Sequence, residues 1–297
     1  MTRRAKLLIA LGVYVGLIIA TAVIFGWTRD DNQEFQPQNE FKLDTWVALP
    51  GPFDINKAVL YVVLAGVLTT GTMIYVARRM QQRPNRIQTL VELAYRLMRD
   101  NITRGNMDDR MAAKWFPFIA TLFLFIWFSN MIGYLPLPTA TEHKVDIFGV
   151  PVPTFALYAA TANLSVPLVL ALVVWIAYNI EGIRAKGLGG YLKSLVPAGV
   201  TGGMAVFIFI LEFFSNIMRL MSLSVRLFAN ILAGHLIILF MAGALVVLLG
   251  IEALGVITLP AGIVLFVFEV GLVATLQAFI FATLTAIYLG GAVAEEH

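Results

Sequence analysis

The chain has 297 residues, of which 59% are hydrophobic and only 13% are charged. A soluble globular domain carries about 25% charged residues, so this composition excludes an ordinary soluble protein and indicates an integral membrane protein. The sequence contains no cysteine, which excludes disulfides and thiolate metal sites. The net charge of +3 does not indicate nucleic-acid binding, because basic residues in membrane proteins collect in the loops on the inner side.

The N-terminus is a short basic leader followed by an apolar segment, residues 7–27. We expect an uncleaved first transmembrane helix here, because the segment is long for the core of a signal peptide. A cleaved signal peptide is the alternative interpretation, since Ala20-Thr21-Ala22 is a small-residue pattern. The acidic, polar residues 28–56 suit the outer side, and we divide the chain into an N-terminal part, 1–56, and a core, 57–297.

Five further apolar segments are candidates for spanning helices: 57–77, 115–135, 155–180, 203–249 and 261–290. Residues 203–249 would form a helix of about 70 Å, far more than a membrane core of ~30 Å requires. This segment therefore either turns back or lies steeply tilted. The sequence predicts an all-α, polytopic membrane protein with about six transmembrane helices, in which 136–154 is a short outer loop.

Basic residues are concentrated at the N-terminus and in two loops, 78–114 and 181–197. The first of these loops contains the segment RIQTLVELAYRLMRD (86–100), whose apolar residues share one face, as in an amphipathic helix at a membrane surface. Because basic loops remain on the inner side, we expect both termini to be inside.

A polar stripe runs through the apolar segment 203–249. Its members are three or four residues apart, so they share one helix face: Glu212, Ser215, Arg219, Ser222, Arg226 and Asn230. Both arginines stay charged, and an arginine held in hydrocarbon costs several kcal/mol. An equally weighted alternative for Glu212 and Ser215 is a helix that packs with its polar face inward and its arginines paired to carboxylates. Arg219 can extend toward the inner surface. Arg226 lies about 10 Å deeper along the helix and has no acidic residue within four positions, so its partner must come from another helix or another chain.

Two titratable residues lie in the same part of the chain. His235 is nine residues beyond Arg226 and faces the opposite side of the helix; a hydrogen-bonded core histidine is an equally weighted alternative to a functional one. Glu269 is the only charged residue between Glu252 and Glu295. One fixed cation, one histidine and one carboxyl suit proton movement and are a poor set for covalent chemistry.

Enzyme motifs are absent from the sequence. There is no phosphate loop, no HExxH and no serine or cysteine triad pattern, and the glycine-rich stretch GLGGYL (187–192) lacks the strand and helix of a nucleotide fingerprint. We therefore expect no catalytic residue, no cofactor and no metal.

Four motifs then point to one family: SNMIGYLP (129–136), GLGGYLKSLVP (187–197), SLSVRLFANILAGH (222–235) and LQAFIFATLTAIYL (276–289). They resemble, in order, landmarks of subunit a of the F-type ATP synthases, and the third and fourth are the dense signatures of that family. The resemblance covers the chain from about residue 80 to the C-terminus.

The resemblance implies a non-catalytic, proton-translocating stator subunit in a bacterial inner membrane. Its implied partners are a rotating ring of c subunits, b-type peripheral stalk subunits and the other ATP synthase subunits, with no nucleic acid. The long C-terminal helices would lie tilted as a hairpin against the ring, and two aqueous half-channels would lead to the ring carboxylates. By match of motif, Arg226 is the essential arginine, and the other implied proton-translocation residues are His235, Glu269, Gln277, Asn230, Glu212, Arg219 and Ser222.

The sequence departs from the family pattern at two positions. Glu269 is eight residues before Gln277, whereas the usual titratable residue is seven before. One residue rotates a side chain by about 100°, so either the helix has a local irregularity or Glu269 points elsewhere. Asn163 stands where the family commonly has aspartate.

Two other classes of protein remain alternatives. A secondary cation/proton antiporter also needs intramembrane charges, although the internal repeats typical of that class are not evident here. A non-conducting assembly subunit of a respiratory complex is the second. The chains that co-purify with this protein would separate the three interpretations. The choice between protons and sodium ions depends on the ring.

Overall fold

The computed structural model covers the whole chain and describes residues 16, 41, 43, 45–47, 55–79, 86–147, 150–197, 199–244 and 255–294. Almost all of the first apolar segment, 7–27, lies outside the described residues, so its helix remains a prediction.

Five helical stretches among the described residues are long and apolar enough to cross a membrane. The first four are single helices: α2 (Lys57–Arg79), α4 (Asp109–Gly133), α5 (Ser165–Lys193) and α6 (Gly203–Leu239). The fifth runs from α8 (Gly255–Phe268) through a π-helical turn, η6 (Glu269–Val273), into α9 (Ala274–Val293). The expected class, an all-α polytopic membrane protein, is confirmed.

Shorter elements connect these helices. They are α3 (Arg86–Arg96), the π-helical segments η2 (Leu97–Thr103) and η4 (Phe240–Ala244), the 3₁₀ turn η3 (Ala160–Ala162), and the strands β1 (Thr45–Val47), β2 (Ile55–Asn56), β3 (Leu137–Ile147) and β4 (Val150–Ala156). The strands pair as two antiparallel hairpins, β1 with β2 and β3 with β4.

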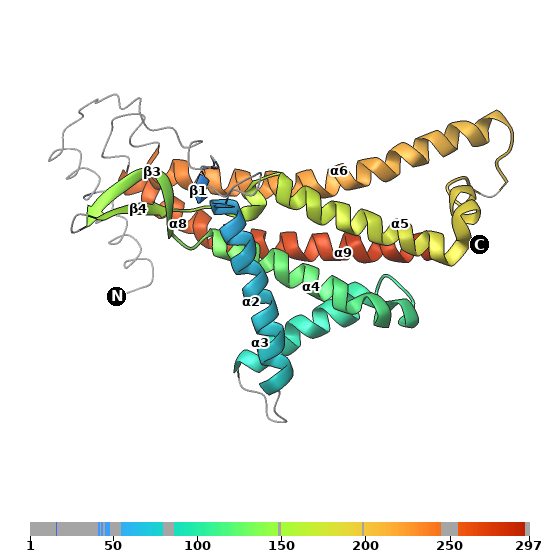
Figure 1. Cartoon of the computed structure of the whole chain (residues 1–297), viewed down its shortest axis with the longest axis horizontal. Coiled ribbons are helices and arrows are strands. Elements are labelled where there is room, and N and C mark those ends of the chain that lie inside the picture. Colours follow the sequence, from blue (N-terminus) through green and yellow to red (C-terminus); the bar gives the residue numbers. More distant parts are fainter. Residues whose placement is uncertain are drawn as a thin grey trace. The chain divides into compact units, whose positions relative to one another are not determined.

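The chain divides into two compact units. One contains residues 43–135, 159–231 and 274–297; the other contains residues 1–42, 136–158 and 232–273. In the first unit α9 packs between α4 and α5, and α2 packs on α4 (Figure 1). In the second unit, α8 packs against η4 and η6, and β3 and β4 form their hairpin.

Small residues allow close packing along α9. Ala274, Ala278, Ala282 and Ala286 are all fully buried. Small side chains let the backbones of membrane helices approach closely, which stabilises association where lipid supplies no hydrophobic driving force. Near the end of the same helix is Gly290, where an added Cβ would overlap the backbone carbonyl of Asn106.

Several element boundaries differ from those expected. The segment expected to begin at 203 is one uninterrupted helix to Leu239 and does not turn back within that range. Residues 137–156, expected to be a loop, form a hairpin despite their prolines, which edge strands tolerate. Pro260 does not mark the start of the last span but lies inside α8, as transmembrane helices allow.

Candidate functional site

A polar cavity of about 330 Å³ lies between α5, the first half of α6 and the end of α9. All of its lining residues belong to one compact unit. They are Tyr178, Lys186, Tyr191, Ser194, Leu195, Pro197, Glu212, Asn216, Arg219, Tyr288, Gly291, Ala292 and Ala294. The basic loop 181–197 therefore forms part of the cavity wall.

Two of the expected site residues meet at this cavity. The Arg219 Nη2 atom lies 3.8 Å from Glu212 Oε2, one heptad earlier on α6. The Arg219 guanidinium also stacks 5.6 Å from the ring centroid of Tyr288 on α9. Both partners of the ion pair keep more than two fifths of their side-chain surface exposed. The pair is therefore open to water and by itself contributes little to the stability of the fold. This ion pair spans seven residues of α6 and was not predicted from the spacing.

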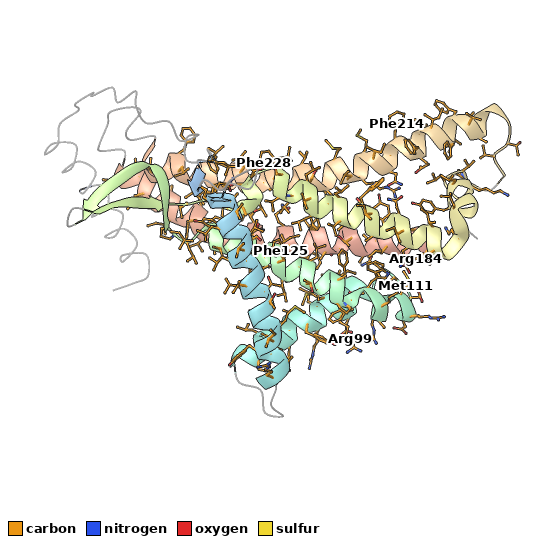
Figure 2. The ribbon with its side chains drawn as sticks, in the orientation of Figure 1. Arg99, Met111, Phe125, Arg184, Phe214 and Phe228 are labelled. Atoms are coloured by element: carbon orange, nitrogen blue, oxygen red, sulfur yellow. The ribbon has the colours of Figure 1, made fainter. Side chains whose placement is uncertain are left out.

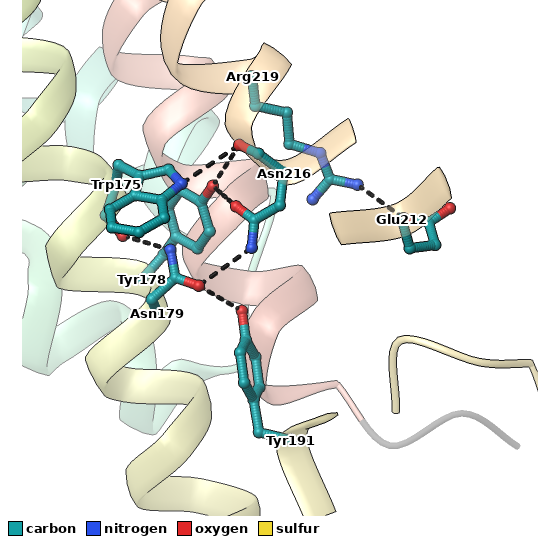
Figure 3. Close-up of polar contacts among 7 residues, drawn as sticks. All are labelled: Trp175, Tyr178, Asn179, Tyr191, Glu212, Asn216 and Arg219. Carbon is teal, nitrogen blue, oxygen red and sulfur yellow. Dashed lines mark hydrogen bonds and ion pairs between the residues drawn. The ribbon is translucent and has the colours of Figure 1, made fainter. Parts of the chain in front are cut away.

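Hydrogen bonds from α5 hold α6 beside the cavity (Figure 3). Trp175 Nε1 donates to the Asn216 backbone carbonyl at 3.2 Å, and Asn216 Nδ2 donates to Asn179 Oδ1 at 3.1 Å. Asn179 Nδ2 donates in turn to the Trp175 carbonyl at 2.7 Å, which closes the ring. The hydroxyl of Tyr178 donates to Asn216 Oδ1, and that of Tyr191 donates to Asn179 Oδ1 at 2.8 Å. We call these five residues the Asn216 clamp.

Tyr191 reaches Asn179 because α5 breaks between them. Twelve residues of straight helix would separate the two by about 18 Å. Gly187 has φ 73° and ψ 161°, a conformation that only glycine adopts without strain, so the last part of α5 changes direction there. The glycine-rich stretch identified in the sequence therefore redirects the chain at this cavity.

Arg226 does not line the cavity. It lies exposed on α6 together with Ser222 and Asn230, while Leu223 and Leu227 on the neighbouring face are buried. Among the described residues, no hydrogen bond, ion pair or ring contact is found for the Arg226 side chain. The expectation that no acid on its own helix neutralises Arg226 is met.

An apolar face of α6 lies beside the polar stripe, about 100° around the helix from Arg226. Figure 2 shows Phe214 on the side of α6 turned away from α5. The large, exposed apolar side chains on this face include Phe207, Leu211, Phe214, Met218, Met221 and Val225. The Arg226 guanidinium therefore lies next to apolar surface without an anionic partner among the described residues.

His235 and Glu269 lie in the second unit. His235 is 1% exposed. A Cβ at Gly234, the residue before it, would overlap the carboxyl group of Glu269. The carboxyl of Glu269 therefore packs directly on the α6 backbone beside His235, and both residues make further interactions.

Glu269 is the first residue of the π-helical turn η6. A π turn accommodates one residue more than an α-helical turn, and such turns are frequent at functional sites. The sequence allowed a local irregularity as one explanation for the eight-residue spacing of Glu269 and Gln277, and η6 is that irregularity. Within α9, Gln277 is 5% exposed.

Comparison with known proteins decides the family. The profile of the family described as ATP synthase A chain matches residues 59–290. The chain belongs to this family. It is 34% identical to ATP synthase subunit a of Rubrobacter xylanophilus over 79% of this chain and 83% of that protein. It is 33% identical to ATP synthase subunit a of Rhizobium rhizogenes (81% and 89% covered) and 31% identical to that of Hyphomonas neptunium (88% and 97% covered).

Membership in the subunit a family makes this chain a membrane subunit of an ATP synthase, of the type that forms the proton-channel stator. The match also sets aside the antiporter interpretation. The resemblance found in the sequence is confirmed over most of the chain.

Sequence reasoning missed the α5 side of the cavity. Tyr178 and Asn179 are polar residues in the middle of an apolar span, which is a signal for an interhelical hydrogen bond. Asn216 lies one position away from the polar stripe and was not included in it. Lys186 and Tyr288 line the cavity too, and no spacing rule links them to α6.

Proposed function

We propose that this chain conducts protons between two half-channels and the carboxylates of a c-subunit ring, and that Arg226 couples this flow to rotation. The observation that carries the proposal is the exposed Arg226 side chain of α6, which has no described ion-pair partner and lies next to an apolar face. A c-ring carboxylate supplies the anion that Arg226 lacks. The attraction between the two charges is about 4 kcal/mol at 4 Å and an effective dielectric of 20, enough to favour the ionised carboxylate locally.

The proposed route begins at the outer half-channel, where His235 and Glu269 exchange protons with a ring carboxylate. Once protonated, the carboxyl is neutral and can face lipid, because the desolvation of an uncharged group is far less costly. The cavity at Glu212 and Arg219 serves as the inner half-channel. Along α6, Arg226 lies between Arg219 and His235, where its charge opposes a direct proton wire. Three further polar residues are proposed to lie beside the exchanging groups: Asn230, Ser222 and Gln277.

The remaining parts of the proposal concern assembly. The subunit has no catalytic residue of its own and acts beside b-type peripheral stalk subunits and the other ATP synthase subunits in a bacterial inner membrane. The long helices α6 and α8–α9 lie tilted as a hairpin against the ring. Residues 1–56 form a separate N-terminal part that precedes the channel core, 57–297.

Photo-cross-linking tests the proposed contact between α6 and the ring. Val225, next to Arg226 in the chain, is 44% exposed, whereas Leu223, two residues earlier, is 3% exposed and provides a matched control. A photoactivatable maleimide attached to Val225→Cys should join this chain to a small membrane subunit of the assembled complex. The same reagent at Leu223→Cys should join it weakly or not at all. Equal products at both positions, or products only with lipid, would exclude this face as the rotor contact.

Labelling with an impermeant thiol reagent tests the orientation. The chain contains no cysteine, so single cysteines report without background. We expect Asn39→Cys to react only from the outer side and Ser194→Cys only from the inner side, because Ser194 follows the basic loop. Reaction of both positions from one side would reject the topology with both termini inside.

A further inference from the structure

The Asn216 clamp joins the first part of α6 to α5 by hydrogen bonds. From Gly203 to Arg226, every hydrogen bond described between α6 and another helix is made by Asn216. The only other polar contact described between this part of α6 and another helix is that of Arg219 with the Tyr288 ring on α9. On the opposite face of α6, Phe214 is 55% exposed. Among the described polar contacts, those of Asn216 therefore oppose most directly a sideways force on this part of α6.

The hydrogen bonds of the Asn216 clamp are well suited to hold α6 at one position relative to α5. Tyr178 and Tyr191 are 3% and 8% exposed, and the hydroxyl group of each donates a hydrogen bond within the clamp. The closed ring of Trp175, Asn179 and Asn216 uses both polar groups of each amide side chain. Buried polar networks whose members are all satisfied hold one arrangement rigidly. The ring is anchored on α5, which itself packs against α9.

From this geometry we infer that the Asn216 clamp is a positioning device for the proposed proton exchange: it holds the Arg226 helix at a fixed place against the lateral force of a moving partner. Arg226 lies ten residues beyond Asn216, or about 15 Å along the same helix. Asn216, Tyr178 and Tyr191 also line the polar cavity, so the same bonds fix the distance between its α5 and α6 walls. Asn216 touches no transferred proton and acts through the position of α6.

The inference rests on the proposed function, and substitution of Asn216 tests it. Asn216→Leu keeps the approximate volume of the side chain and removes both amide hydrogen bonds. Per assembled complex, we expect ATP-driven proton pumping to fall about tenfold, since a shift of an ångström in a reacting group can lower a rate by more than that. ATP hydrolysis should continue, so the number of protons pumped per ATP falls. A displaced α6 lowers the number of protons pumped per ATP, whereas a smaller amount of assembled complex leaves that number unchanged.

Milder and combined variants keep the test decisive if Asn216→Leu assembles poorly. Tyr178→Phe removes a single hydroxyl and should lower the same ratio by a smaller factor. The double variant should be no worse than Asn216→Leu alone, because residues that act as a unit are not additive. Ser215→Ala removes a neighbouring hydroxyl with no described hydrogen bond and should pump as the unaltered protein does.

Three results would overturn the inference: an unchanged proton-to-ATP ratio in Tyr178→Phe and Asn216→Leu, multiplicative losses in the double variant, or an equal loss in Ser215→Ala. Failure of the proposed function is recognised separately, since Arg226→Ala complexes would then pump normally whatever happens at Asn216.

Discussion

Arg226→Ala should abolish ATP-driven proton pumping while the complex still assembles. The physical reason is that no described group within the chain neutralises this guanidinium, so we expect it to interact with an anionic group of a partner subunit. Assembly should survive, because an exposed side chain without contacts contributes little to the fold. Acidification of inverted vesicles should fall to the level seen without ATP, at equal amounts of the subunit.

Arg226→Lys should restore little of this pumping, although lysine is also basic. A lysine can lose its proton when it is desolvated, and it lacks the forked guanidinium that can bind a carboxylate through two parallel hydrogen bonds. Pumping by Arg226→Lys close to that of the unaltered protein would show that a point charge is sufficient, and would contradict the need for a permanent, forked cation.

Removal of the Glu269 carboxyl should have the second largest effect. Glu269→Gln and His235→Ala should each slow proton flux by about tenfold to a hundredfold, the lower range of what a positioned proton-transfer group contributes. The double variant should be little slower than the slower single variant, because the two are proposed to act as one unit. Coupling of the remaining flux to ATP hydrolysis should persist, since Arg226 is intact. Proton flux in reconstituted vesicles measures all three.

Gly234→Ala provides a steric counterpart to these substitutions. Its methyl group would meet the carboxyl of Glu269 and displace it without changing any titratable group. We expect a reduced flux that Glu269→Gln does not lower further. Multiplicative losses for His235 and Glu269, or full flux in Glu269→Gln, would remove Glu269 from the proton path.

The sequence could predict what depends on periodicity and charge. Alternation of three and four residues placed Arg219 and Arg226 on one helix, and the structure has them on α6. The lack of an acid within four residues predicted that no residue nearby on the same helix neutralises Arg226, and none of the described residues there does. The spans of α2, α4 and α5 also follow from apolar length alone, apart from their ends.

The sequence could not predict contacts made between distant segments. Asn216 and Asn179 are 37 residues apart and meet only because α5 and α6 lie side by side. The π turn at Glu269 depends on a choice between two backbone hydrogen-bond patterns, which residue periodicity does not reveal. The β3–β4 hairpin contains three prolines, which made a loop the better prediction from composition.

The central claim is that Arg226 couples proton movement to the motion of a ring. The most direct measurement is ATP-driven acidification of vesicles that contain equal amounts of assembled complexes with Arg226 or with Arg226→Ala. The account predicts acidification with the former and none with the latter, while both hydrolyse ATP once the ring is free to turn. Sustained acidification by assembled Arg226→Ala complexes would contradict it.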